Sequence, residues 1–197
     1  MEENTVPQIY SKEVLEFVAV ATEFTIVTDE LYNYSQKQFI QYAAKLLPLL
    51  YIKAQLLPDA TAEDPEGIEK FVSEEEWTKI KLQVEQLMGD LDEYKENIGR
   101  FEANETNSIS ENFADIYQDI KDFTSLYNTA VDELMNDAVA EVKRTFSEYW
   151  GQRLVNTLRI LHFYLYNEEL QTDRNDDSSE NTENWLTEQR KNEWEIE

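Results

Sequence analysis

The sequence predicts an all-α fold: a single-domain bundle of about five to six helices, followed by a disordered acidic C-terminal tail. Apolar residues recur at helical spacing along most of the 197 residues. The chain has only 4 Gly and 4 Pro, too few for the many turns of an all-β sandwich. Hydrophobic residues make up 41% of the chain, enough to build one core. We expect residues 1–10 to be a flexible N-terminus, residues 11–167 to form the bundle, and residues 168–197 to be the tail.

The first half of the chain predicts three helices. Residues 11–33 form the first, because their apolar side chains recur one turn apart. Ser35 begins the second helix, since a glutamine three places on completes a capping box. Pro48 lies inside this helix and predicts a kink, because proline lacks a backbone donor. Ser73 begins the third helix with acids in its first turn, and Gly89 ends it.

The second half predicts a longer and more apolar helical region. Residues 90–107 fit either a short helix or a loop, and no segment of the chain has the alternation of a strand. Ser110 is expected to cap the next helix. Residues 139–165 are apolar on much of the helix circumference, which is typical of a central helix or a dimer interface. Gly151 inside this helix predicts a close helix–helix approach beside Trp150.

The charge and composition exclude several classes of function. The 17 Lys and Arg against 42 Asp and Glu give a net charge of -25, which disfavours direct binding of nucleic acids and of membrane surfaces. No cysteine and one histidine exclude a thiol nucleophile and a multi-histidine metal site from one chain. No glycine-rich phosphate loop is present, and we expect no cofactor. The start has no signal-peptide pattern and no stretch approaches the ~20 apolar residues of a membrane span, so we expect a cytoplasmic protein.

Three stretches carry a resemblance to a known family: LLPLLYIKAQLLP at residues 46–58, ADIYQDIKDF at residues 114–123, and WGQRLVN at residues 150–156 followed by Leu161-His162. They resemble a bacterial domain-of-unknown-function family of small, acidic, all-helical proteins. The resemblance covers about residues 11–166 and leaves the tail outside. It implies a single helical domain, and it brings no activity, cofactor or partner.

Asp115, Asp119 and Asp122 stand at i, i+4 and i+7, which places three carboxylates along one side of a helix. Of the three, we expect Asp119 to be partly buried. Carboxylates at this spacing can bind Mg²⁺ or Mn²⁺, so these three are weak candidates for a metal site. In a chain with 42 acids the same spacing also arises by coincidence, and a solvated helix face with internal salt bridges is the favoured interpretation.

Three residues of the long C-terminal helix complete the candidate polar cluster. Arg153 lies at the edge of an apolar stripe, where it either needs a carboxylate partner or extends its head to water. If buried, we expect it to pair with Asp119, and Asn156 could add an amide to the same cluster. His162 is the only histidine, the residue type that most often serves as a catalytic base, but no matching serine motif accompanies it, so a structural role is favoured.

The leading hypothesis is a non-catalytic helical bundle that acts through protein–protein contacts, with another protein or with a second copy bound through the last helix. One alternative is a divalent-metal-dependent hydrolase that uses the three aspartates. The second is an acidic mimic of nucleic acid that binds a basic protein, suggested by the charge of -25. The hypotheses differ in whether the aspartates, Arg153 and His162 converge on one cleft.

Overall fold

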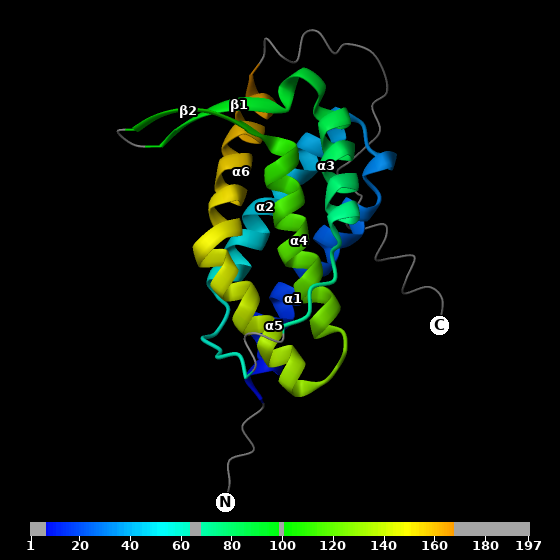
Figure 1. Cartoon of the computed structure of the whole chain (residues 1–197), viewed down its shortest axis with the longest axis vertical. Coiled ribbons are helices and arrows are strands. Elements are labelled where there is room, and N and C mark those ends of the chain that lie inside the picture. The colour runs from blue at the N-terminus through cyan, green and yellow to red at the C-terminus, as the bar shows by residue number, and fades with distance from the viewer. Residues whose placement is uncertain (1–6, 64–67, 99–100, 168–197) are drawn as a thin grey trace, which may run out of the picture. The chain divides into compact units, whose positions relative to one another are not determined.

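The computed structural model describes residues 7–63, 68–98 and 101–167, with backbone alone at residues 96–98 and 101–105. It confirms the helical class (Figure 1). The described residues form these α-helices: α1 (Lys12–Asp29), α2 (Gln36–Gln55), α3 (Glu74–Met88), α4 (Ile109–Tyr127), α5 (Asp132–Thr145) and α6 (Gly151–Tyr166). The tail predicted for residues 168–197 lies outside the described residues.

Side-chain caps begin the first three helices at the serines predicted from the sequence. Ser11 Oγ accepts a hydrogen bond from the Val14 N–H, and Ser73 Oγ caps α3 in the same way. Ser35 and Gln38 form the complete capping box of α2. Gly89 ends α3 with a positive φ of 54°, a conformation that glycine adopts without steric cost.

The predicted cap of α4 is wrong by two residues. Ser108, not Ser110, precedes the helix, and its hydroxyl accepts from the Glu111 N–H. Ser110 is fully buried, and both its N–H and its hydroxyl donate to the Asp92 carboxylate, at 2.8 and 2.7 Å. The position of the cap therefore depends on an aspartate 18 residues earlier in the chain.

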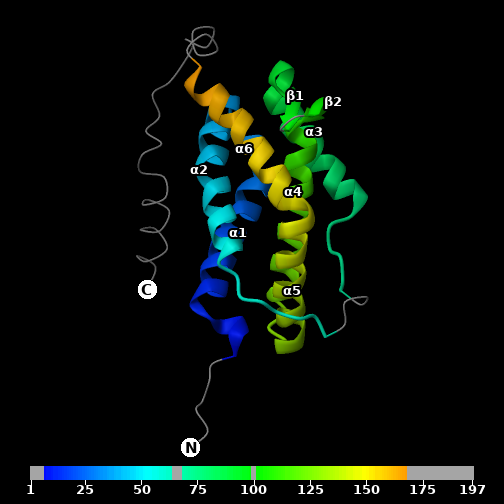
Figure 2. The ribbon, with the colours of Figure 1, turned by 90° about the vertical axis from the view of Figure 1, so that its left-hand side faces the viewer.

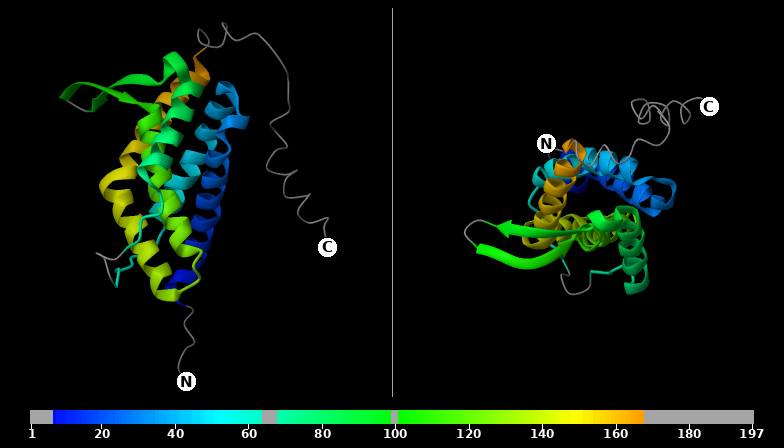
Figure 3. Two further views of the ribbon diagram at one scale, coloured as in Figure 1. Left: turned by 45° about the vertical axis from the view of Figure 1, so that its right-hand side comes forward. Right: turned by 90° about the horizontal axis from the view of Figure 1, so that it is seen from above.

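A β-hairpin occupies the region for which a short helix or a loop was predicted. Strands β1 (Glu93–Ile98) and β2 (Phe101–Ser108) pair antiparallel and extend away from the bundle (Figures 1 and 3). Tyr94 anchors the base of the hairpin, because its Oη accepts from Asn112 Nδ2 at 2.6 Å on α4. The prediction that the chain has no strand is therefore wrong.

α5 and α6 are joined by one π-helical turn, Phe146–Trp150. Such turns insert an extra residue into an α-helix. A Cβ atom on Gly151 would collide with the Phe146 carbonyl oxygen and ring, so the glycine is required by the turn itself. The atoms nearest to such a Cβ belong to Phe146 in the preceding turn, and not to a second helix as the sequence predicted.

α4 lies at the centre of the bundle, in contact with α1, α3, α5 and α6, while α2 packs against α1 and α6 (Figures 1 and 2). Trp150, Tyr117 and several phenylalanines are fully buried in one continuous core. Residues 8–10, expected to be flexible, form a short 3₁₀ turn in which Ile9 is buried and its carbonyl accepts from Tyr127 Oη. None of the described helices has both the length and the apolar content to cross a membrane.

Candidate functional site

The three aspartates on α4 divide between two separate clusters. Asp115 belongs to a cluster shared with α3 and α6, which we name the Asp115 cluster. Asp119 and Asp122 face α5 and the segment before α3, in what we name the Asp122 cluster. Asp122 is buried, with 6% of its surface exposed, and Asp119 is half-buried, in agreement with the partial burial predicted for it.

In the Asp115 cluster, three side chains donate to one carboxylate. The Asp115 carboxylate accepts from Trp77 Nε1 on one oxygen and from Tyr149 Oη on the other, both at 2.9 Å. The second oxygen also lies 3.0 Å from Arg153 Nε. The guanidinium covers the Tyr149 ring at 4.4 Å, and its Nη1 donates to Asn112 Oδ1 at 2.9 Å.

This arrangement contradicts the predicted pair of Arg153 with Asp119. The arginine does pair with a carboxylate of α4, but with the one a helical turn earlier. Through it, α6 is connected to α4, and Trp77 connects α3 to the same carboxylate. A carboxylate saturated by three donors has little capacity to bind a substrate or a metal, so we interpret the Asp115 cluster as a structural joint.

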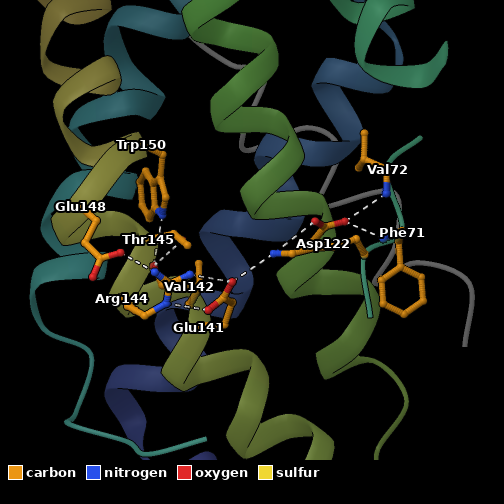
Figure 4. A network of polar contacts seen from close by, with 10 residues as sticks. Phe71, Val72, Asp122, Glu141, Val142, Arg144, Thr145, Glu148 and Trp150 are labelled. Carbon is orange, nitrogen blue, oxygen red and sulfur yellow. Dashed lines mark hydrogen bonds and ion pairs between the residues drawn. The ribbon is translucent and has the colours of Figure 1, made fainter. Parts of the chain in front are cut away.

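The Asp122 cluster gathers acids around one lysine. Asp122 Oδ1 accepts from the backbone N–H groups of Phe71 and Val72, at 2.7 and 3.0 Å (Figure 4). Lys70 Nζ lies 3.8 Å from Asp122 Oδ2 and 3.1 Å from Glu141 Oε1 on α5. Asp122 therefore fixes the chain segment that leads into α3, and Lys70 links this segment to α5.

The same cluster holds the most perturbed acid of the site. Burial, together with the negative charges of Asp122 and Glu141, raises the pKa of Asp119 to about 6, against the opposing effects of the Thr145 hydroxyl and Lys70. Burial also raises the pKa of Asp122, although the two backbone N–H donors lower it. Asp122 Oδ2 is buried and accepts no hydrogen bond within the part of the chain that the structure describes.

The space enclosed by this cluster is too small for a substrate. Asp119, Asp122 and Glu141 line a cavity of about 10 Å³, comparable to the volume that one water molecule requires. Within residues 7–63, 68–98 and 101–167, no three His, Asp or Glu side chains are grouped so that they could hold a metal ion. The cluster can bind a proton, and its cavity has no room for a ligand larger than a water molecule.

Asn156 and His162 belong to neither cluster. Asn156 Oδ1 accepts from Gln152 Nε2 at 2.8 Å on the same helix. His162 is exposed, and its ring centroid lies 4.7 Å from that of Tyr166. The six candidate polar residues thus do not converge on one cleft.

The outer sides of α2 and α6 form a surface that was not anticipated from the sequence. On each helix, four exposed residues follow the same i, i+4, i+7, i+11 spacing, which aligns them along one side. We name the two rows together the α2–α6 face: Lys45, Leu49, Ile52 and Leu56 on α2, and Val155, Arg159, His162 and Tyr166 on α6. The two helices lie side by side (Figure 2).

The apolar members of this face are exposed to an unusual degree for their type. Leu49, Ile52 and Leu56 are 46%, 50% and 52% exposed, and Val155 and Tyr166 are 42% and 68% exposed. Single exposed leucines are common on protein surfaces, but a row of them on each of two neighbouring helices forms a candidate interaction site.

The two helices of this face are also free of acids. Residues 31–58 and 149–167 contain no Asp or Glu, in a chain that has 42 of them. These stretches carry Lys37, Lys45, Lys53, Arg153 and Arg159. The two gaps in the distribution of acids are visible in the printed sequence, and they are the signal that could have identified the surface.

Comparisons with known proteins place this architecture in a family. A model described as a domain of unknown function, DUF5063, matches residues 8–167, which confirms the resemblance recognised in the sequence. The crystal structure of protein BF1032 from Bacteroides fragilis is similar, with 36% sequence identity and a TM-score of 0.74. The match covers 81% of this chain and 96% of that one. No curated protein matches.

Proposed function

Since the chain belongs to the DUF5063 family, a domain of unknown function, we propose that it acts without catalysis, by binding another protein through the α2–α6 face. The proposal keeps the leading hypothesis from the sequence and gives it a surface. It also keeps the last helix, predicted from its apolar circumference, as part of that surface.

The candidate catalytic side chains bind other residues of the chain, which supports a non-catalytic role. Asp115 and Arg153 bind each other and the side chains of three further residues, so neither is available to an incoming substrate. Asp122 holds backbone N–H groups. The only histidine of the chain contacts a tyrosine ring at the surface, away from both clusters.

The observation that carries the proposal is the pair of exposed rows on the α2–α6 face. Each row spans three helical turns, and the apolar side chains in it leave about half of their surface in water. Covering such side chains stabilises a complex by roughly 25 cal/mol for each Å² of apolar area removed from water. Rows at this spacing are the form in which a helix presents anchors to a partner helix.

Photo-crosslinking in cells tests this proposal. A photoreactive amino acid at Ile52 should give covalent adducts with another protein. The matched control is Leu82 on α3, which is 55% exposed against 50% for Ile52 but lies outside the face. Adducts of equal yield at both positions, or none at Ile52, would contradict the proposal.

A further inference from the structure

We infer that the partner segment which binds the α2–α6 face is an acidic amphipathic helix, with leucine-like or aromatic side chains on one side and Asp or Glu beside them. This inference rests on the proposed function and names the chemistry of the partner. It follows from the sign of the charge on the face, the pairing of its cations, and the spacing of its apolar rows.

The local charge of the face is opposite to that of the whole protein. α2 and α6 carry five Lys and Arg and no acid, whereas the chain as a whole has a net charge of -25. Lys53 and Arg153 pair with Glu16 and Asp115 on neighbouring helices, which leaves three cations to give these helices a positive local charge. At physiological ionic strength the Debye length is about 8 Å, so a ligand in contact with the face responds mainly to the charges within it. A narrow acidic segment is therefore attracted to this face despite the acidic remainder of the protein.

The cations of the face are available to a partner. Lys37, Lys45 and Arg159 are exposed and form no ion pair with any residue that the structure describes. Elsewhere in the bundle the exposed cations have acids nearby: Lys70 contacts Glu141, and Arg144 contacts Glu148. Lys79 and Lys95 are also exposed without an ion pair in the described part of the chain, but each has acids within four residues along the sequence, whereas Lys45 and Arg159 have none.

The apolar rows select a helix over other polyanions. Leu49, Ile52 and Leu56 are spaced three and four residues apart, which is the spacing of the apolar seam along which two helices pack. A nucleic acid would satisfy the cations and leave these side chains in water. An anionic membrane is broad and flat, so its approach would also bring the acidic helices next to it. A second copy of the chain would bring two charges of -25 together.

Titration of the full-length chain with synthetic amphipathic helices tests the inference. The probe has leucines on one side and glutamates on the other, and the comparison peptide has lysine at every glutamate position. We expect the glutamate helix to bind about tenfold more tightly at low salt, and its advantage to shrink as salt rises. If the acidic remainder of the protein governs binding instead, the lysine helix binds more tightly, and the inference is overturned.

Charge-reversal variants locate the binding surface. Lys45→Glu with Arg159→Glu should weaken binding of the glutamate helix about tenfold. The matched control, Lys79→Glu with Lys95→Glu, makes the same change in net charge at exposed positions of α3 and β1 and should leave the affinity unchanged. Equal loss in both pairs would show a general charge effect and overturn the inference.

Two further measurements decide between occupants. A dimer by light scattering that Ile52→Glu dissociates, or face-dependent binding to vesicles of phosphatidylserine, would replace the acidic helix by a second copy or by a membrane. Crosslinking at Ile52 without binding of the glutamate helix would leave the proposed function intact and overturn the partner chemistry alone. Absence of both would overturn the two together.

Discussion

The Asp115 and Asp122 clusters stand one to two turns apart on the same helix and differ in how completely their charges are paired. In the Asp115 cluster, one carboxylate meets one guanidinium and two neutral donors. In the Asp122 cluster, Asp119, Asp122 and Glu141 lie around Lys70, and of these three acids Arg144 pairs only with Glu141. One buried oxygen of Asp122 accepts no hydrogen bond in the described part of the chain.

Acids on a helix can therefore have two different effects, depending on whether they are paired. A paired carboxylate positions its neighbours: Asp115 fixes the height at which α6 and α3 meet α4. An unpaired excess of acids makes stability depend on pH, because the folded protein then holds a proton that the unfolded chain releases. The same residue type at the same helical spacing therefore serves rigidity in one place and proton binding in the other.

Removal of the Asp115 carboxylate should have the largest effect on stability. Asp115→Ala leaves the Arg153 guanidinium, the Trp77 N–H and the Tyr149 O–H without their acceptor, and we expect a loss of about 3 kcal/mol in the free energy of unfolding. Urea denaturation measures it. Asp115→Asn retains one acceptor oxygen and should lose about half as much. A loss below about 1 kcal/mol for the alanine variant would show that the cluster is not a structural joint.

Double-mutant cycles should distinguish the observed arginine partner from the predicted one. Asp115→Asn with Arg153→Met is expected to show a coupling energy of about 1–3 kcal/mol, since the two charges are in contact. Asp119→Asn with Arg153→Met should be additive within about 0.5 kcal/mol. Strong coupling in the second cycle would favour the pair expected from the sequence.

Helical spacing predicts which way a side chain points around its own helix axis. It does not predict which residue of a neighbouring helix lies level with that side chain. For this reason the sequence placed Arg153 correctly toward the acids of α4 but paired it with Asp119 in place of Asp115, one turn away. Ser108 and Ser110 illustrate the same limit. Either serine could cap α4, and the choice depends on a distant bond of Ser110 to Asp92.

The helices themselves were predictable because their signals are local. Serine caps and a terminal glycine act within a few residues, and the apolar stripe of the last helix continued correctly through the π turn. The β-hairpin was not predictable in this way. Its strands are polar, with few β-branched residues, and Tyr94 is held by Asn112 across the fold.

Neutralisation of Asp119 should have a smaller effect, opposite in sign to that at Asp115. The pKa of about 6 in the folded protein lies above the ordinary value of 3.8, so the contribution of Asp119 to stability is greatest below pH 3.8 and is lost as pH rises through 6. Asp119→Asn removes this loss and keeps an acceptor for Thr145. We expect the variant to be about 1–2 kcal/mol more stable than the parent near pH 7.5, a value reduced for the partial exposure of the side chain.

Urea denaturation between about pH 4 and pH 8 checks this sign. The difference between the variant and the parent should shrink toward pH 4, where Asp119 is protonated in the folded protein and about half protonated in the unfolded chain. Asp115→Asn serves as the control, because its cost should remain at the higher pH. A variant that is less stable than its parent near pH 7.5 would show that Lys70 fully compensates the charge of Asp119.

Divalent cations should have the smallest effect of all, and their effect is the sharpest test of whether the unpaired acids form a metal site. In the Asp122 cluster, Asp122 Oδ1 is occupied by two N–H groups, and Lys70 stands between Asp122 and Glu141. A cation would have to displace both, in a cavity of about 10 Å³. Millimolar Mg²⁺ or Mn²⁺ should therefore change the Tm by less than about 1 °C relative to Na⁺ at matched ionic strength, since only a ligand that binds the folded state raises it. A clear rise in the parent that Asp119→Asn abolishes would place a cation among these acids, and it would shift the balance from a protein-binding bundle to the divalent-metal hydrolase.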